Sequence, residues 1–381
     1  MAKTDSRKVS ARLGLLLALF IAVLYGLQVA GVLDLGLFDL AEPAPNQGVV
    51  SGDQDWFRVY FTQPNYPDEL SDHHGGLDET LAADIDRAQT SVDVAAYDFD
   101  LERVADALVA AHERGVRVRM VTDTDNVDLR PVRQLDRAGI AIVDDDRGAI
   151  MHNKFVVIDG QVVWTGSWNL TDNGTYRNDN NAVRVVAPRL AENYTAEFEE
   201  MFQDRAFGPT SPADTPHPQV RVATGEQGGA TVLFENYFAP EDEVAARIVT
   251  LVENAERSVR FLAFSFTDDQ LGDALKDQKK AGLEIQGVFE ARGSDTEYSE
   301  YGRLRQARPS LDVLTDGNPY IMHHKVIILD DEIVILGSFN FTASADESND
   351  ENILVIHSPE VAALYRAEFD RIYAQAVEAQ E

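Results

Sequence analysis

An unusual polar pattern occurs twice in this chain of 381 residues, each time inside an otherwise apolar run. The first copy, MHNKFVVIDG, begins at Met151, and the second, IMHHKVIILDD, begins at Ile321. In each copy a histidine precedes a lysine by two residues, and an aspartate follows that lysine by five. Polar groups in buried segments are costly unless they are paired or used. The repetition therefore predicts a duplicated chain in which both copies serve a function.

The duplication extends to the segments that precede these copies. AQTSVDVAAYDFD, from Ala88, matches AERSVRFLAFSFT, from Ala255, at an offset of 167 residues. A β-rich run in each half is followed by an amphipathic helix ending at Gly115 or Gly282, and then by a second strand. At the histidines the offset is 171, so four extra residues are expected in the second half, between positions 290 and 319.

A strand and a long helix close each half of the chain. The strands are expected at 182–186 and 353–357, and the helices at 189–202 and 359–373. Strands that alternate with helices predict an α/β fold with a largely parallel or mixed sheet covered on both faces. The expected parts are a basic segment at 1–12, an apolar segment at 13–33, a tether at 34–55, a first lobe at 56–206, a proline-bearing linker at 207–219 and a second lobe at 220–376.

The apolar segment at 13–33 carries no charged residue and follows Lys3, Arg7, Lys8 and Arg12. A helix of this length spans about 30 Å of hydrocarbon. Because basic flanks stay on the cytoplasmic side, we expect a single-pass transmembrane helix in the cell membrane with the rest of the chain extracytoplasmic. A secretory signal that is cleaved on export, releasing a secreted protein, is the alternative.

The composition is strongly acidic, with 65 Asp and Glu against 33 Lys and Arg and a net charge of −32. Only seven of the basic residues are lysines. This balance favours a protein that stays soluble in high salt, where charge repulsion is screened over about 3 Å at 1 M, and thus a halophilic source. An acidic surface without environmental meaning is the alternative. The chain has no cysteine, which excludes disulfides, thiolate nucleophiles, zinc–thiolate sites and lipidated cysteines.

The histidine and lysine of each copy are expected to act together. Residues two apart in a strand share a face, so His152 and Lys154 point the same way, as do His323 and Lys325. His324 is expected to lie off that face. A lone histidine in a buried strand is usually a satisfied core residue, but two complete copies in one register favour a catalytic constellation.

Further polar residues follow each lysine in the same register. Asp159 and Asp330 lie at an odd offset from their histidines; we count them with the catalytic motif but expect them to position it rather than touch a substrate. The turns GSWNLT and GSFNFT offer neutral donors to a ligand. These donors are Ser167, Asn169, Ser338 and Asn340.

A third repeated element, RNDNN or SNDEN, places Glu351 at the position that Asn180 has in the first half. A carboxylate there can accept the second ring proton of a histidine, and we expect Glu351 to support His323. His152 then lacks an equivalent carboxylate, for which Asp179 is a candidate.

His-x-Lys-x4-Asp followed by Gly-Ser-x-Asn, present twice, resembles the phospholipase D superfamily from about Phe57 to Tyr373. The resemblance implies two duplicated phospholipase D-like α/β/α lobes with one active site at their interface. It also implies a phosphohistidine formed on His152, with His323 as the general acid. Lys154, Lys325, Asn169 and Asn340 would hold the phosphate oxygens. No metal or other cofactor is expected, and a monomer is expected because one chain carries both motifs.

The function expected from this resemblance is a phosphodiesterase that hydrolyses or transfers phospholipid headgroups beside the membrane. One alternative is a metal-independent nuclease, which would need a basic track such as Arg292, Arg303, Arg305 and Arg308. The others are a cardiolipin-synthase-like transferase, normally expected to have more membrane-spanning sequence, and a non-catalytic lipid-binding module.

Overall fold

The computed structural model describes residues 47–49, 56–224 and 230–381. The apolar segment at 13–33 lies outside these ranges, so its expected transmembrane helix remains a prediction. Within them, none of the helices combines the length and apolar character needed to cross a bilayer.

Two eight-stranded sheets have the same strand order, β1-β2-β9-β7-β6-β3-β4-β5 and β10-β11-β18-β17-β16-β12-β13-β14. The first contains β1 (Gln47–Val49), β2 (Phe57–Phe61), β3 (Ser91–Ala96), β4 (Arg117–Thr122), β5 (Ala141–Asp144), β6 (Lys154–Ile158), β7 (Val162–Gly166) and β9 (Asn181–Val186). The second contains β10 (Gln219–Ala223), β11 (Thr231–Ala239), β12 (Ser258–Ala263), β13 (Glu284–Phe289), β14 (Asp312–Thr315), β16 (Lys325–Leu329), β17 (Ile333–Gly337) and β18 (Glu351–His357). The matching order confirms the duplicated α/β fold.

Both sheets are mixed, as expected. β3, β4 and β5 are parallel to one another, as are β12, β13 and β14, whereas the other strand pairs are antiparallel. The four extra residues of the second half lie between β13 and β14. β1 falls within the expected tether and pairs with β2, so that part of the tether is an edge strand of the first sheet.

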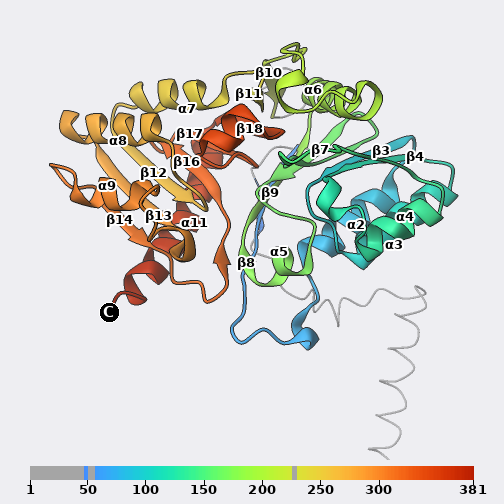
Figure 1. Cartoon of the computed structure of the whole chain (residues 1–381), viewed down its shortest axis with the longest axis horizontal. Helices are drawn as coiled ribbons and strands as arrows, with labels where there is room; N and C mark the ends of the chain where they lie inside the picture. The colour runs from blue at the N-terminus through green and yellow to red at the C-terminus, as the bar shows by residue number, and fades with distance from the viewer. Residues whose placement is uncertain (1–46, 50–55, 225–229) are drawn as a thin grey trace, which may run out of the picture. The chain divides into compact units, whose positions relative to one another are not determined.

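Helices cover both faces of each sheet (Figure 1). The outer faces carry α2 (Leu77–Arg87), α3 (Glu102–Glu113) and α4 (Arg130–Arg137) in the first lobe, and α7 (Val244–Glu253), α8 (Asp269–Ala281) and α9 (Glu300–Gln306) in the second. Other helical segments are α5 (Asp172–Tyr176), α10 (Ala343–Glu347), η1 (Leu70–Asp72), η2 (Thr124–Asn126), η3 (Glu200–Asp204), η4 (Gly208–Thr210) and η5 (Ala291–Gly293).

The two lobes share one core built around α6 (Pro188–Glu199) and α11 (Pro359–Glu378). Tyr194 of α6 packs edge-on against Phe155 of its own sheet and against Phe238 of the second lobe. Because the same buried cluster includes side chains from both sheets, the lobes form one body in which the inner faces meet.

The strand register brings the two histidine segments to corresponding sheet ends. Ala96, the last residue of β3, is opposite Lys154, and Ala263, the last residue of β12, is opposite Lys325. We call this end, where β3, β4, β12 and β13 finish and β6 and β16 begin, the histidine end of the sheets. A third, two-stranded sheet joins the lobes there, because β8 (Asn178–Asp179) pairs with β15 (Ile321–Met322).

Candidate active site

Each histidine is held by the main chain of the other lobe. The N–H of His152 donates to the carbonyl oxygen of Asp350 (3.0 Å), and that of His323 donates to the carbonyl oxygen of Asp179 (2.8 Å). The histidines therefore precede β6 and β16 rather than lying in them. Their backbones run along the interface between the lobes, which brings both motifs to one place.

An aromatic ring lies beside the histidine and lysine of each copy. The ring of Tyr97 is 5.0 Å from that of His152, and the Nζ of Lys154 lies 5.3 Å from the same ring. Phe264 occupies the same place in the second lobe, at 4.5 Å and 4.6 Å from the corresponding groups. The histidine and lysine thus share a face, as expected. Sequence reasoning missed these rings, although the 167-residue offset places two aromatic residues in register.

The partners of the histidines are crossed between the lobes, which corrects the expected pairing. His152 Nδ1 lies 2.7 and 2.8 Å from the carboxylate oxygens of Glu351, whereas His323 Nδ1 lies 3.0 Å from Asn180 Oδ1 and 3.1 Å from the carbonyl oxygen of Ser167. Glu351 therefore supports His152 and not His323. Because these partners are acceptors, we assign the Nδ1 proton to each ring, which leaves Nε2 for chemistry.

The motif serines hold these partners instead of a ligand. Ser167 Oγ donates to Asn180 Oδ1 (2.8 Å), and Ser338 hydrogen-bonds to Glu351. Each hydroxyl also accepts a main-chain N–H from β9 or β18. The expectation that the serines bind phosphate is therefore wrong, because both hydroxyls are buried and engaged.

Asn169 and Asn340 remain available to a ligand. Their side-chain oxygens are buried and have no hydrogen-bond partner among the described residues. A side-chain amide has an NH2 group that donates and an oxygen that accepts, and rotation of the amide by 180° exchanges their positions. Their amide oxygens stay unused, and their role in holding phosphate remains a prediction.

Asp159 and Asp330 lie at the opposite sheet end from the histidines. Asp159 accepts main-chain hydrogen bonds from Thr90 (2.7 Å) and its neighbours just before β3, and Asp330 accepts them from Arg257 (2.7 Å) and its neighbours just before β12. Burial raises the pKa of each carboxyl, but these N–H groups hold it below its ordinary value. Both are positioning residues, so grouping them with catalytic residues was wrong.

The four motif groups are almost fully buried and mutually repulsive. Burial and the neighbouring lysines lower the pKa of His152 and His323 well below its ordinary value. Burial lowers the pKa of Lys154 to about 7, and burial together with Lys154 lowers that of Lys325 well below its ordinary value. Burial also raises the pKa of Glu351 to about 8. An anion entering this cluster would favour the protonated lysines.

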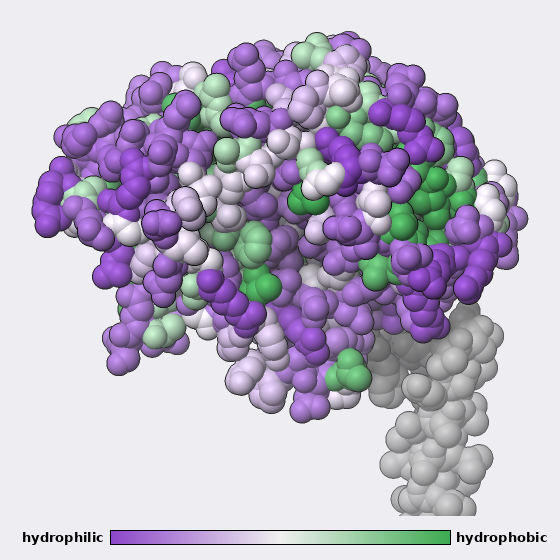
Figure 2. Space-filling view, in the orientation of Figure 1, coloured by the Kyte–Doolittle hydropathy of each residue, from purple (hydrophilic) through white to green (hydrophobic). Residues whose placement is uncertain are grey.

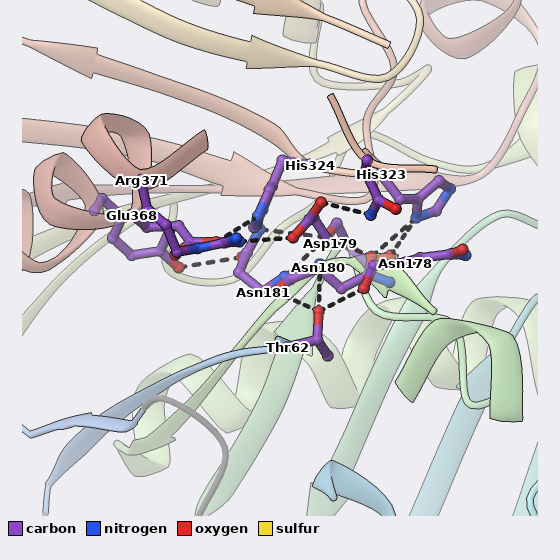
Figure 3. A network of polar contacts seen from close by, with 12 residues as sticks. Thr62, Asn178, Asp179, Asn180, Asn181, His323, His324, Glu368 and Arg371 are labelled. Atoms are coloured by element: carbon purple, nitrogen blue, oxygen red, sulfur yellow. Dashed lines mark hydrogen bonds and ion pairs between the residues drawn. The ribbon is translucent and has the colours of Figure 1, made fainter. Parts of the chain in front are cut away.

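His324 belongs to a second network, as its expected place off the catalytic face implied. Its Nδ1 lies 3.0 Å from Asn181 Nδ2, and its Nε2 lies 3.2 Å from a carboxylate oxygen of Glu368 (Figure 3). Glu368 also accepts from Arg371, which donates to Asp179 (2.6 Å). Asp179 therefore pairs with Arg371 and does not support His152, because its side chain points into the second lobe.

The first lobe has carboxyls where the second has an ion pair. Glu200 stands at the position of Arg371, and its oxygens lie with those of Glu197 and Glu241 within 4.8 Å of one another. Burial raises the pKa of Glu200 to about 9 and that of Glu241 to about 8. Among the described residues this is the group of carboxyls placed to hold a metal ion. It contacts the motif through Asn153, which donates to Glu197 (2.8 Å).

A family model described as "Cardiolipin synthase, PLD-like domain" matches residues 81–202 and 248–373, and so covers both lobes. A mitochondrial cardiolipin hydrolase of Xenopus tropicalis is 37% identical over 123 residues, 31% of this chain and 57% of that protein. A phospholipase D of Rickettsia prowazekii is 35% identical over 128 residues, 34% of this chain and 62% of that protein. The chain thus spans about three fifths of the length of these relatives.

Solved structures show the same fold. A phosphatidylserine synthase of Haemophilus influenzae superposes with a TM-score of 0.61 and 14% identity, over 83% of this chain and 86% of that one. A polyphosphate kinase of Porphyromonas gingivalis gives a TM-score of 0.59 and 15% identity, over 84% of this chain and 47% of that one. At this identity the likeness concerns the fold alone.

Proposed function

The chain belongs to the phospholipase D superfamily, and from that premise we propose that it cleaves phosphodiesters, with phospholipid headgroups as its substrate. One observation carries the proposal: two histidines and two lysines are buried together, burial lowers the pKa values of all four, and repulsion from neighbouring positive charges lowers those of His152, His323 and Lys325 further. A phosphodiester anion is the kind of ligand that relieves this repulsion.

The unequal support of the histidines favours His152 as the nucleophile. When its Nε2 bonds to phosphorus, the ring becomes positively charged, and the Glu351 carboxylate stabilises that charge. The bound phosphodiester anion raises the pKa of His323, so that its Nε2 also carries a proton in the complex. The bond from phosphorus to the headgroup oxygen breaks as that oxygen takes this proton. His323 then takes a proton from water, whose oxygen bonds to phosphorus while the bond to His152 breaks. The neutral Asn180 amide leaves His323 free to lose its proton.

The lysines supply the positive charge of the phosphate site. Lys154 and Lys325 lie beside both histidines, and a bound phosphate raises their pKa values so that both carry a proton in the complex. Asn169 and Asn340 complete the contacts to the non-bridging oxygens through their amides, whose oxygens have no partner among the described residues.

A lipid substrate fits the described surface better than nucleic acid does. The basic track that a nuclease needs is weak, because the second-lobe arginines are already engaged. Arg303 pairs with Asp269, Asp273 and Glu300, Arg305 lies over Tyr301, and Arg292 and Arg308 donate to main-chain oxygens. The relatives named for cardiolipin hydrolysis and phospholipase D support the same choice.

The proposal includes attachment to the cell membrane by residues 13–33, with the two lobes extracytoplasmic and monomeric. Cleavage of that segment and secretion of the lobes is the alternative. In either case both motifs come from one chain, so no second copy is needed to complete the site.

The test incubates the full chain in molar salt with vesicles of phosphatidylcholine and cardiolipin, and separately with single- and double-stranded DNA. We expect release of headgroup from the vesicles and no cleavage of DNA; the His152→Ala variant is the control for contamination. Adding glycerol distinguishes transfer, which yields a new phosphatidyl alcohol, from hydrolysis. DNA cleavage without lipid cleavage would replace the lipid proposal with the nuclease, and cleavage of neither would reject both.

A further inference from the structure

The first lobe carries a connection that the second lobe lacks. Residues 62–76 join β2 to α2, whereas only residues 240–243 join β11 to α7. Phe61, at the end of β2, is opposite Asn181, at the start of β9, so this longer connection leaves the sheet at the histidine end. In Figure 1 it is the blue segment that projects below β8 and α5.

Large exposed hydrophobic side chains gather at this end of the molecule. Among the described residues they are Tyr66 (70% exposed), Leu70 (78%), Tyr298 (72%) and Val377 (41%). Tyr66 and Leu70 lie on residues 62–76, Tyr298 lies between β13 and α9, and Val377 lies in the last turn of α11, which lines a pocket with Tyr66. Figure 2 shows a small hydrophobic spot at this lower edge with hydrophilic residues around it, and a broader hydrophobic area on the right side of the first lobe.

The connection at 62–76 is held in place rather than free. Asp68 accepts from Arg177 (2.8 Å) and lies 2.8 Å from the ring of His73, which stacks on Tyr176 at 4.1 Å. The main-chain N–H of Asp68 also donates to the hydroxyl of Tyr320, which belongs to the second lobe (2.9 Å). These contacts fix the segment while two of its apolar side chains stay exposed.

The chain enters the described body from the same end. β1 runs antiparallel to β2, with Gln47 opposite Tyr60, so the residues that precede Gln47 join at the histidine end. Residues 34–46 separate this point from the uncharged segment at 13–33 and span at most roughly 45 Å when fully extended. If residues 13–33 are an anchor, its covalent connection to the body is therefore at the histidine end and not at the opposite end.

We propose that the histidine end docks on a phospholipid bilayer, with Tyr66, Leu70 and Tyr298 entering the headgroup region. The inference rests on the proposed lipid substrate, and it accounts for exposed apolar side chains at the same end of the sheets as the two histidines. Glu69, Asp72 and other carboxylates lie near them, so the surface suits a zwitterionic bilayer and high salt better than an anionic one at low salt.

Site-specific labelling tests the docking directly, because the chain has no native cysteine. The full chain with Leu70→Cys or Tyr298→Cys is labelled at the new cysteine with an environment-sensitive fluorophore. Each labelled protein is reconstituted in phosphatidylcholine vesicles whose acyl chains bear a nitroxide, which quenches the fluorophore. Gln161→Cys, exposed at the opposite sheet end, is the matched control. We expect strong quenching at the first two positions and little at the third. Equal quenching at all three positions, or none at the first two, would overturn the inference.

A second measurement separates this inference from the proposed function. Leu70→Ser is expected to lower turnover of vesicle lipid several-fold, with turnover of a short water-soluble phosphodiester as the reference. If the unmodified chain cleaves the soluble diester but vesicle turnover does not respond to Leu70→Ser, the docking is refuted while the function stands. If the unmodified chain cleaves neither substrate, the function is refuted, and the quenching pattern decides the docking by itself.

Discussion

Replacing Glu351 by glutamine should slow turnover without unfolding the protein. The carboxylate lies 2.7 and 2.8 Å from His152 Nδ1 and is fully buried. A hydrogen bond to a charged group contributes about 1.5–3 kcal/mol, and each 1.36 kcal/mol is a factor of about ten in rate. Since this charge is needed only when His152 carries phosphorus, we expect kcat to fall about 10- to 150-fold.

The pH dependence of the same variant gives an independent check. Burial raises the pKa of Glu351 to about 8, so the fraction of carboxylate grows as pH rises toward that value. The wild-type rate on a soluble diester should therefore rise with pH up to about 8, and this rise should be missing in Glu351→Gln. Circular dichroism at each pH shows whether the variant stays folded.

The matched control is Asn180→Asp, at the corresponding position behind His323. It adds a carboxylate near the general acid but leaves the support of His152 intact, so it should cost much less than Glu351→Gln. If Asn180→Asp were the more damaging change, or if Glu351→Gln kept the full rate, the assignment of His152 as the nucleophile would be refuted.

Four further outcomes are expected. His152→Ala and His323→Ala should each abolish turnover of lipid, and substantial turnover of lipid by either variant contradicts the mechanism. With a diester that has a good leaving group, only His323→Ala should accumulate a phosphohistidine, which mass spectrometry detects. EDTA should leave the rate unchanged, because lysines supply the charge of the site; loss reversed by one divalent metal, with the fold intact by circular dichroism, would contradict this. Glu200→Gln should raise the melting temperature more at pH 8 than at pH 5. The pKa of Glu200 is about 9 in the folded chain and ordinarily 4.5, so the wild-type chain loses stability as pH rises from 4.5 toward 9. A larger rise in melting temperature at pH 5 would show that Glu200 is held as a carboxylate. Raising salt toward the molar range should increase the free energy of unfolding, since 65 carboxylates repel one another, and should leave KM for lipid flat; a steep rise in KM would favour a nucleic-acid substrate.

Much of the fold follows from local patterns that the sequence repeats. The helices that end at Gly115 and Gly282 do so where the backbone takes φ values of 90° and 104°, which glycine adopts without strain. The apolar runs that follow each motif lysine became β6 and β16, each buried along its whole length. Because helix ends and buried strands depend on neighbours along the chain, the printed sequence was sufficient to predict them.

The motif residues were also identified from the sequence, since two copies in one register distinguish them from core residues. The roles of Ser167, Ser338, Asp159 and Asp330 were not, because each depends on which groups fold against it. The sequence could show that these residues correspond in pairs. It could not show that the serines turn toward Asn180 and Glu351, or that the aspartates bind main-chain N–H groups at the far sheet end.

By itself the sequence determined that there are two lobes, which residues correspond in them, and which four groups form the motif. Only the tertiary structure decided which lobe supports which histidine. A repeat makes Glu351 equivalent to Asn180, but it gives the same spacing whether each residue faces its own lobe or the other. Pairing of β8 with β15, and of Met151 with Asp350, carries each segment across the interface and places Glu351 behind His152. Contacts between lobes depend on how two folded surfaces meet, and spacing along one chain does not encode that.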